Sequence, residues 1–159
     1  MRLLCVLLCA LVCAPAAVAR TDGGRQLDLA WPANGTLTSP YGWGEGRWHP
    51  GIDIGSLRSL DVHAAEAGVV TRAGTPPGYE GYGNVVEVRV SDRYSNLYAH
   101  LERTLVVAGQ PVGAGQQLGV AGCTGWCTGT HLHFELRERG RPVDPTSLIT
   151  GYNQPFQGG

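Results

Sequence analysis

Glycine divides the apolar parts of this sequence into segments of strand length, and this feature most constrains how the chain can fold. The 159 residues include 24 glycines and 10 prolines. Both residue types destabilise helix interiors and favour tight turns, and no long amphipathic helix is evident. The sequence therefore predicts one small all-β domain, an antiparallel β-sheet or β-sandwich-like fold with few short helical turns.

Seven segments have the composition and flanking turn residues of strands. They are residues 27–31, 35–38, 51–54, 68–74, 84–90, 96–101 and 131–140. The last segment is expected to continue through a turn at 138–140 into a hairpin strand at 141–143. Glycine at nearly every corner of residues 106–122 predicts tight β turns. Residues 144–149 predict one helical turn, with Asp144 as its cap and Pro145 at its first position.

The first 19 residues have the pattern of a secretory signal peptide. One arginine precedes an apolar run and then small residues, which predicts cleavage after Ala19. A membrane anchor is the alternative, but the apolar run from Leu3 to Ala14 is too short to span a bilayer and is followed by Pro15. We therefore expect no membrane span after the signal is removed.

Cys13 raises the alternative of a lipid anchor. Val12 precedes it, where lipoprotein signals usually have a small residue, so lipid attachment at Cys13 is not expected. The remaining chain is expected to form a polar lead-in at 20–26, one domain at 27–150 and a flexible tail at 151–159. The mature protein is expected in the periplasm or outside the cell.

The composition and net charge of the chain indicate which kinds of molecule it can bind. Apolar residues make up 43% of the chain and charged residues 16%, as in folded globular proteins. A net charge of −1 provides no basic field, so no nucleic-acid partner is expected. We expect a monomer.

Only two cysteines remain after signal cleavage. Cys5, Cys9 and Cys13 leave with the signal, whereas Cys123 and Cys127 stay. In an oxidising compartment such a pair favours a disulfide bond, with free thiols as the alternative. A zinc site would need two more soft ligands, and no other cysteine is present.

The segment GTHLHFEL places an unusual set of side chains on one strand. Alternate strand residues share a face, so His131, His133 and Glu135 lie together, with leucine and phenylalanine on the other face. Two histidines that are separated by one residue lie about 6.7 Å apart along a strand, close enough to approach one centre. A buried apolar face explains the leucines but not the histidines.

A second pair of metal-binding residue types lies upstream. His49 and Asp53 would be about 13 Å apart in an extended chain, too far to share an ion. Pro50 and Gly51 are suited to supply the bend that brings them together. Imidazole and carboxylate bind zinc, and open catalytic zinc sites use three protein ligands. His63 is interpreted as an ordinary strand residue.

With these motifs the chain resembles the M23 metallopeptidases, the lysostaphin and LytM type of peptidoglycan endopeptidase. The resemblance extends from Trp31 to Ile149. The motifs that match in order are HPGIDI, GYGNVVEV, LYAHL, GVAGCTGWCTGTHLHFEL and RPVDP.

The resemblance implies a role for each site residue. It implies that His49, Asp53 and His133 bind one Zn²⁺ ion and that His100 and His131 act in catalysis. Glu135 either orients an imidazole from behind or is a plain surface carboxylate. The cysteine pair is not part of the family motif, and a bridge there could hold the loop that aims His131 and His133.

The function implied is that of an exported zinc metalloendopeptidase. Its substrates would be peptidoglycan peptides, cut in their stems or cross-links. The alternative is a non-catalytic LytM-type module that binds the wall or activates a cell-wall amidase. A structural zinc domain is disfavoured, because closed structural sites use four protein ligands and only three are apparent.

Overall fold

The computed structural model of the chain describes residues 21–22, 25–44 and 46–150. Ten strands form the main sheet. Their bounds are β4 (Thr36–Ser39), β7 (Ile52–Gly55), β8 (Asp61–His63), β9 (Gly68–Gly74), β10 (Asn84–Arg89), β11 (Tyr94–Thr104), β12 (Pro111–Val112), β13 (Gln117–Ala121), β14 (Leu132–Glu138) and β15 (Arg141–Val143). All pairs in this sheet are antiparallel, and the expected all-β class is confirmed.

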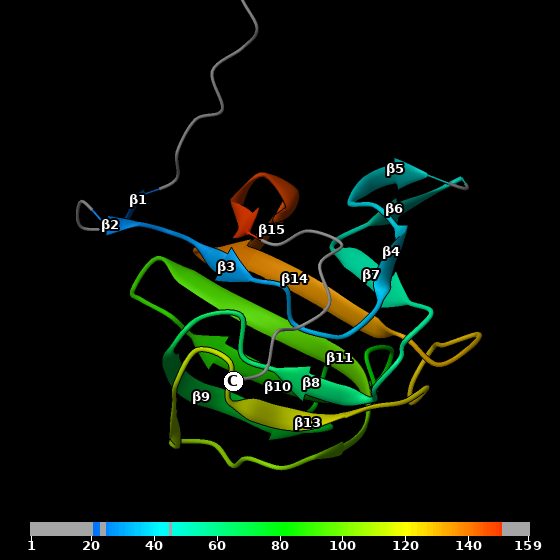
Figure 1. Cartoon of the computed structure of the whole chain (residues 1–159). Helices are drawn as coiled ribbons and strands as arrows, with labels where there is room; N and C mark the ends of the chain where they lie inside the picture. Colours follow the sequence, from blue (N-terminus) through cyan, green and yellow to red (C-terminus); the bar gives the residue numbers. More distant parts are fainter. Residues whose placement is uncertain (1–20, 23–24, 45, 151–159) are drawn as a thin grey trace, which may run out of the picture.

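The long strand β11 organises this sheet (Figure 1). The strand order is β12-β9-β10-β11-β14-β7-β4, while β13 pairs with both β11 and β8, and β15 pairs with β14. One half of β11, from Tyr94 to Ala99, pairs with β14, and the other half, from Leu101 to Thr104, pairs with β13. The polar site predicted on β14 therefore lies beside the point where β11 changes partners.

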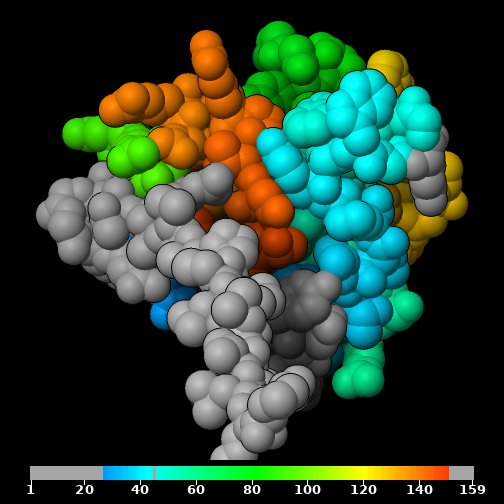
Figure 2. Space-filling model, turned by 90° about the horizontal axis from the view of Figure 1, so that it is seen from above, coloured from blue at the N-terminus to red at the C-terminus, as the bar shows by residue number. Residues whose placement is uncertain are grey.

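Smaller pairs of strands surround the main sheet. They are β1 (Thr21–Asp22) with β2 (Arg25–Gln26), β5 (Gly42–Gly44) with β6 (Arg47–His49), and β3 (Leu29–Ala30) in parallel with β16 (Ile149–Thr150). Figure 2 shows the cyan segment that contains β4–β7 packed beside the orange β14–β15 hairpin. This arrangement brings β6 and β7 to the polar face of β14.

Apolar side chains cover both faces of the sheet. The larger cluster includes Leu132, Phe134 and Leu136 of β14, all fully buried. A smaller cluster on β10 and β11 consists of Val85, Leu97 and Ala99, and Tyr79 and Tyr82 pack against it. The polar face of β14 is buried as well, because His133 is 4% exposed and Glu135 is not exposed at all.

Most predicted strands are present, with shifted ends. Residues 27–31 form only the two-residue strand β3, and the final strand begins at Leu132, since His131 forms an isolated bridge with Gly122. The β5–β6 hairpin and β8 were not predicted, and residues 106–122 contain β12 and β13 besides their turns. Edge strands this short lack the alternation that would reveal them.

The predicted helical turn is present as a 3-10 helix, Thr146–Leu148. Pro145 precedes it rather than opening it, while the Asp144 carboxylate accepts a hydrogen bond from the Thr146 amide at 2.9 Å. Across the described part of the chain, no helix is both long and apolar enough to cross a membrane. The predicted signal peptide and flexible tail lie outside the described residues.

Candidate active site

Three strands bring the first three candidate ligands to one point. His49 ends β6, Asp53 lies in β7, and His133 of β14 is paired in register with Asp53. Asp53 Oδ1 lies 2.8 Å from His133 Nδ1 and 3.1 Å from His49 Nε2, and these two nitrogens are 3.1 Å apart. The expected bend is present, since Pro50 and Gly51 separate β6 from β7.

The hydrogen bonds behind each imidazole determine which ring nitrogen carries a proton. His49 Nδ1 lies 2.8 Å from the Pro40 carbonyl oxygen, which can only accept, so Nδ1–H is the donor. His133 Nε2 lies 3.0 Å from the Glu135 carboxylate and donates to it in the same way. The Nε2 of His49 and the Nδ1 of His133 therefore both present lone pairs to Asp53.

Three lone-pair acceptors that face one another require a positive charge between them. When that charge is a proton, the histidine nitrogens can donate to Asp53: burial raises the pKa of Asp53, but hydrogen bonds with His133 and His49 outweigh burial and lower it well below its usual range. Burial lowers the pKa of His133, and hydrogen bonds with Asp53 and Glu135 reverse this and raise it. The cluster therefore favours a bound cation, either a proton or a metal ion.

Gly51 allows the two strands that carry the site to approach closely. A Cβ atom at Gly51 would lie 2.4 Å from the Phe134 carbonyl oxygen and 3.0 Å from Cε1 of His133. The first distance is shorter than real Cβ contacts, and the second is shorter than most of them. Any side chain here would push β7 away from β14 and separate Asp53 from His133.

Glu135 lies behind His133 in a network of buried polar groups. Its Oε1 accepts from the Tyr82 hydroxyl at 2.7 Å, and its Oε2 accepts from Arg137 Nε at 2.6 Å. Burial raises the pKa of Glu135, but the interactions with His133 and Arg137 have the larger effect and lower it overall. The carboxylate is therefore held ionised. The alternative of a surface carboxylate is wrong for Glu135. Arg137 follows at strand spacing on the same face, so the sequence held a signal for this pair.

His100 lies at an irregularity of β11. The register with β10 shifts between Asn84 and Val86, so that Ala99 and His100 stand opposite a single residue. His100 has a φ of 60°, a left-handed conformation that is uncommon for a residue with a side chain. Bulges of this kind turn a side chain out of the regular alternation, and here the imidazole is turned toward the site.

The imidazole of His100 is neutral and has a fixed orientation. Its Nδ1 lies 2.8 Å from the Thr124 carbonyl oxygen and donates a hydrogen bond to it, which leaves Nε2 with a lone pair. Burial lowers the pKa of His100, and the hydrogen bond to Thr124 only partly offsets this effect. His100 can therefore accept a proton at neutral pH.

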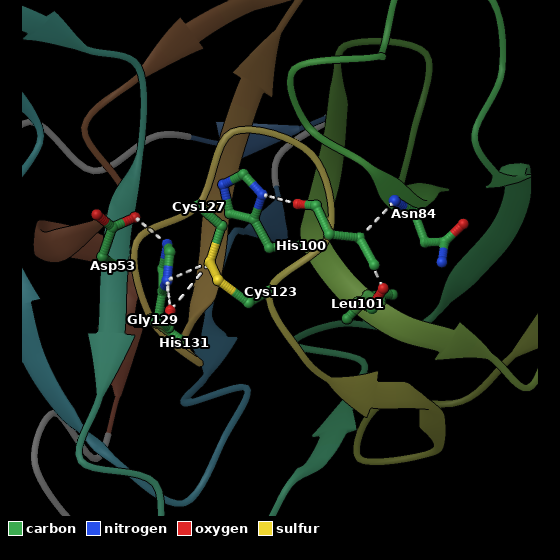
Figure 3. The surroundings of a disulfide bond; sticks show 9 residues. Asp53, Asn84, His100, Leu101, Cys123, Cys127, Gly129 and His131 are labelled. Carbon is green, nitrogen blue, oxygen red and sulfur yellow. Dashed lines mark hydrogen bonds and ion pairs between the residues drawn. A yellow bond between two sulfur atoms is a disulfide. The ribbon is translucent and has the colours of Figure 1, made fainter.

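His131 lies beside His100, and its imidazole is likewise held by a backbone carbonyl oxygen (Figure 3). Its Nδ1 donates to the Gly129 carbonyl oxygen at 2.7 Å, and its Nε2 lies 3.6 Å from Asp53 Oδ1. The ring centroids of His100 and His131 are 4.9 Å apart. Two imidazoles whose Nδ1–H groups are held by backbone carbonyls thus direct their Nε2 atoms toward the three candidate ligands.

The predicted disulfide bond between Cys123 and Cys127 is present in the structure, with Cα atoms 5.2 Å apart (Figure 3). It was expected to hold the loop that aims His131 and His133. The loop carbonyls instead contact His131 and His100, whereas the ring nitrogens of His133 contact Asp53, His49 and Glu135. The disulfide-closed loop therefore contacts the two candidate catalytic histidines, His100 and His131, and not the ring nitrogens of His133.

The three candidate ligands and the two candidate catalytic histidines lie in an open groove of about 610 Å³. All five line it, and His63 is not among its lining residues. Its walls include the half-exposed Trp48, the highly exposed Trp126, and the side chains of Arg47, Glu80 and Tyr82. The sequence did not reveal these wall residues, because they come from loops and a short hairpin without a characteristic spacing.

Two histidines and an aspartate meet at one point, and two further histidines lie beside it in an open groove. This set of side chains is of the kind that open catalytic zinc sites use. A model of peptidase family M23 matches residues 47–145. The chain belongs to this family, and the resemblance noted from its motifs is confirmed.

Relatives and solved structures agree with this assignment. The chain is 41% identical over 120 residues to "Lipoprotein NlpD/LppB homolog" of Pseudomonas aeruginosa, which covers 76% of this chain and 39% of that protein. It is 37% identical to "Murein hydrolase activator NlpD" of Escherichia coli, over 75% of this chain and 30% of that one. A zinc containing peptidase from Vibrio cholerae superimposes with a TM-score of 0.65 at 32% identity, over 76% of this chain and 40% of that chain.

These similarities bear on the location of the protein. The chain spans less than half the length of the curated relatives it matches. A lipoprotein and a murein hydrolase activator are cell-envelope proteins, so the similarity supports the expectation of export. The expectation that Cys13 carries no lipid gains no support, because relatives of this chain are lipoproteins. Cys13 itself lies outside the described residues.

Proposed function

We propose that this chain is a zinc metalloendopeptidase of the periplasm that hydrolyses peptide bonds in peptidoglycan stem peptides or cross-links. One observation carries the proposal. The lone pairs of His49, Asp53 and His133 converge, and the imidazoles of His100 and His131 border the same groove. A chain that only binds peptidoglycan would need neither feature.

The donor set fits a zinc ion. Tetrahedral zinc with bonds of about 2.0–2.1 Å to nitrogen or oxygen needs ligand atoms roughly 3.3 Å apart. The three candidate atoms lie 2.8–3.1 Å from one another, and no more than a small expansion would be required. When bound here, zinc supplies a Lewis acid that polarises a carbonyl and lowers the pKa of water to about 7.

His100 and His131 supply the proton transfers in this proposal. Their free Nε2 atoms can accept a proton from water, stabilise the developing oxyanion as donors once protonated, and return a proton to the leaving amine. Each Nδ1–H stays bonded to a backbone carbonyl oxygen, so each ring keeps its orientation. Asp53, 3.6 Å from His131 Nε2, can stabilise His131 in its charged form.

The groove suits a peptide with both charged and apolar groups. Arg47 and Glu80 provide opposite charges, and Trp48 and Trp126 provide exposed aromatic faces. An extended peptide carrying amino and carboxyl groups could pair with both. Peptidoglycan peptides have these groups, and we propose them as partners of a monomeric chain.

A second function is supported by the relatives. The E. coli protein that matches 75% of this chain is named a murein hydrolase activator. A module of this kind would use the same groove to bind a partner protein and would hydrolyse nothing. We place this candidate second, because activation needs neither convergent lone pairs nor two oriented imidazoles beside them.

One digestion experiment separates the two functions. The mature chain, loaded with zinc, is incubated with purified peptidoglycan, alone and with a cell-wall amidase, and the released muropeptides are analysed by mass. The endopeptidase predicts products cut between amino acids without the amidase. An activator predicts no product alone and more amidase product in the mixture, and that result would overturn the first proposal.

A further inference from the structure

We propose that the loop closed by the Cys123–Cys127 disulfide is a clamp that positions both candidate catalytic histidines, and that Thr124 is its positioning residue. The inference rests on the proposed endopeptidase function. The clamp is defined as residues 122–130, between β13 and the His131 bridge. Two carbonyl groups of this clamp, those of Thr124 and Gly129, accept the Nδ1–H bonds of His100 and His131.

Thr124 fixes the first half of the clamp to two strands. Its hydroxyl donates to the Leu101 carbonyl oxygen at 2.8 Å and accepts from the Asn84 backbone amide at 2.9 Å. Leu101 follows His100 directly in β11, and Asn84 begins β10. The side chain of Thr124 therefore holds its own carbonyl group in register with the bulge that carries His100.

Close backbone packing reinforces this first attachment. The Trp126 amide donates to the Gly81 carbonyl oxygen at 2.8 Å. A Cβ at Gly83 would lie 2.4 Å from the Thr124 carbonyl carbon, and a Cβ at Gly125 would lie 2.4 Å from the Gly83 amide nitrogen. The turn at 81–83 and the segment at 124–126 thus fit against each other without room for a Cβ at Gly83 or Gly125.

The disulfide bond joins the second half of the clamp to the anchored first half. Cys123 is covalently joined to Cys127, which lies two residues before Gly129. A backbone hydrogen bond also holds this half, but it is long, at 3.3 Å from the His131 amide nitrogen to the Gly122 carbonyl oxygen. The bridge therefore links the position of the Gly129 carbonyl, and with it His131, to the segment that Thr124 anchors.

Both imidazoles depend on this clamp for their tautomer as well as for their orientation. A carbonyl oxygen beside Nδ1 favours the tautomer that carries its proton there, and only this form leaves the Nε2 lone pair toward the groove. In the other tautomer, a proton on Nε2 would prevent the ring from accepting one from water. Displacement of a catalytic group by about 1 Å can cost about a hundredfold in rate.

Thr124→Val tests the first half of the clamp. Valine has the shape of threonine but cannot make the bonds to Leu101 and Asn84. With zinc content held at the wild-type level, we expect kcat to fall at least about tenfold while KM changes little. Thr124→Ser keeps the hydroxyl and should recover most of the rate. Thr36→Val, at an exposed position of β4 outside the clamp and the groove, is the matched control.

Nitrogen NMR of the histidine rings gives a readout that does not depend on hydrolysis. Wild type should show the Nδ1–H tautomer for His100 and His131. Thr124→Val should mix the tautomers of His100, and Cys123→Ser with Cys127→Ser should mix those of His131. Unchanged tautomers and rate in Thr124→Val, or no recovery in Thr124→Ser, would overturn the clamp.

The same measurements separate the clamp from the endopeptidase proposal. A wild-type chain that hydrolyses nothing but shows ordered Nδ1–H tautomers, mixed by Thr124→Val, would contradict the enzyme and retain the clamp. An active wild type with a fully active Thr124→Val would contradict the clamp and retain the enzyme.

Discussion

His133 and Glu135 form a buried hydrogen bond of 3.0 Å between Nε2 and Oε1 along one face of β14. The bond directs the other ring nitrogen of His133 toward Asp53 and His49. Because Tyr82 and Arg137 also donate to Glu135, the carboxylate cannot turn away from the imidazole. A carboxylate behind a metal-binding histidine is a common means of fixing its tautomer and raising its basicity.

Glu135→Gln should weaken zinc binding. Glutamine has the shape of glutamate without its charge, so His133 loses a charged acceptor and Arg137 loses its ion pair with Glu135. We expect zinc affinity to fall about 10–100-fold, the range typical of groups that support a ligand. Competition with a chromophoric chelator measures it. Glu102→Gln, at an exposed site, is the matched control, and equal affinities in both variants would contradict this role for Glu135.

Gly51→Ala should separate the ligands without changing any of them. The added methyl group would meet the Phe134 carbonyl and His133, so β7 must move away from β14. Overpacking of this kind costs about 1–3 kcal/mol of the free energy of unfolding. We expect a lower melting temperature together with weaker zinc binding, measured by calorimetry and metal analysis.

Gly113→Ala provides the control for this substitution. Nothing lies within 4 Å of a Cβ at Gly113, so alanine there should leave both quantities near the wild-type values. If Gly51→Ala matched this control in stability and zinc content, the close approach of β7 and β14 would not be needed for the site.

His131→Ala should distinguish a catalytic histidine from a ligand. The Nε2 of His131 lies 3.6 Å from Asp53, outside the triangle that the three candidate ligand atoms form. We expect the variant to keep its zinc and to lose hydrolysis by at least about a hundredfold, the scale of lost acid–base help. Elemental analysis and a cleavage assay on the same sample measure both. A metal-free His131→Ala protein would make His131 a ligand instead.

Local patterns predicted most of the strands and marked the candidate ligands on two segments, while the resemblance to family M23 implied which residues meet at the site. Alternation along β14 and the bend at Pro50–Gly51 follow from nearest-neighbour geometry, which a sequence carries directly. The bulge that turns His100 into the site could not be predicted in this way. It arises where β11 exchanges its pairing partners, and that exchange depends on strands distant in sequence.

The residues that support the site from distant parts of the chain could not be predicted from local sequence patterns either. Tyr82 reaches Glu135 across 53 positions of the chain, and Thr124 meets Asn84 across 40. Neither residue has a spacing that marks it, because its role depends on tertiary packing. The loop closed by Cys123 and Cys127 was found through its cysteines, but only the structure showed that its carbonyl oxygens bind His100 and His131 rather than His133.

The most direct test of the central claim joins metal content to hydrolysis in one titration. Wild type and Asp53→Ala are stripped with a chelator, and cleavage of a purified cross-linked muropeptide is followed as zinc is added back. The stripped wild type should be inactive and should recover its rate at about one zinc per chain, while Asp53→Ala should neither retain the ion nor recover. Full activity of the zinc-free wild type, or full zinc loading and activity of Asp53→Ala, would contradict the account.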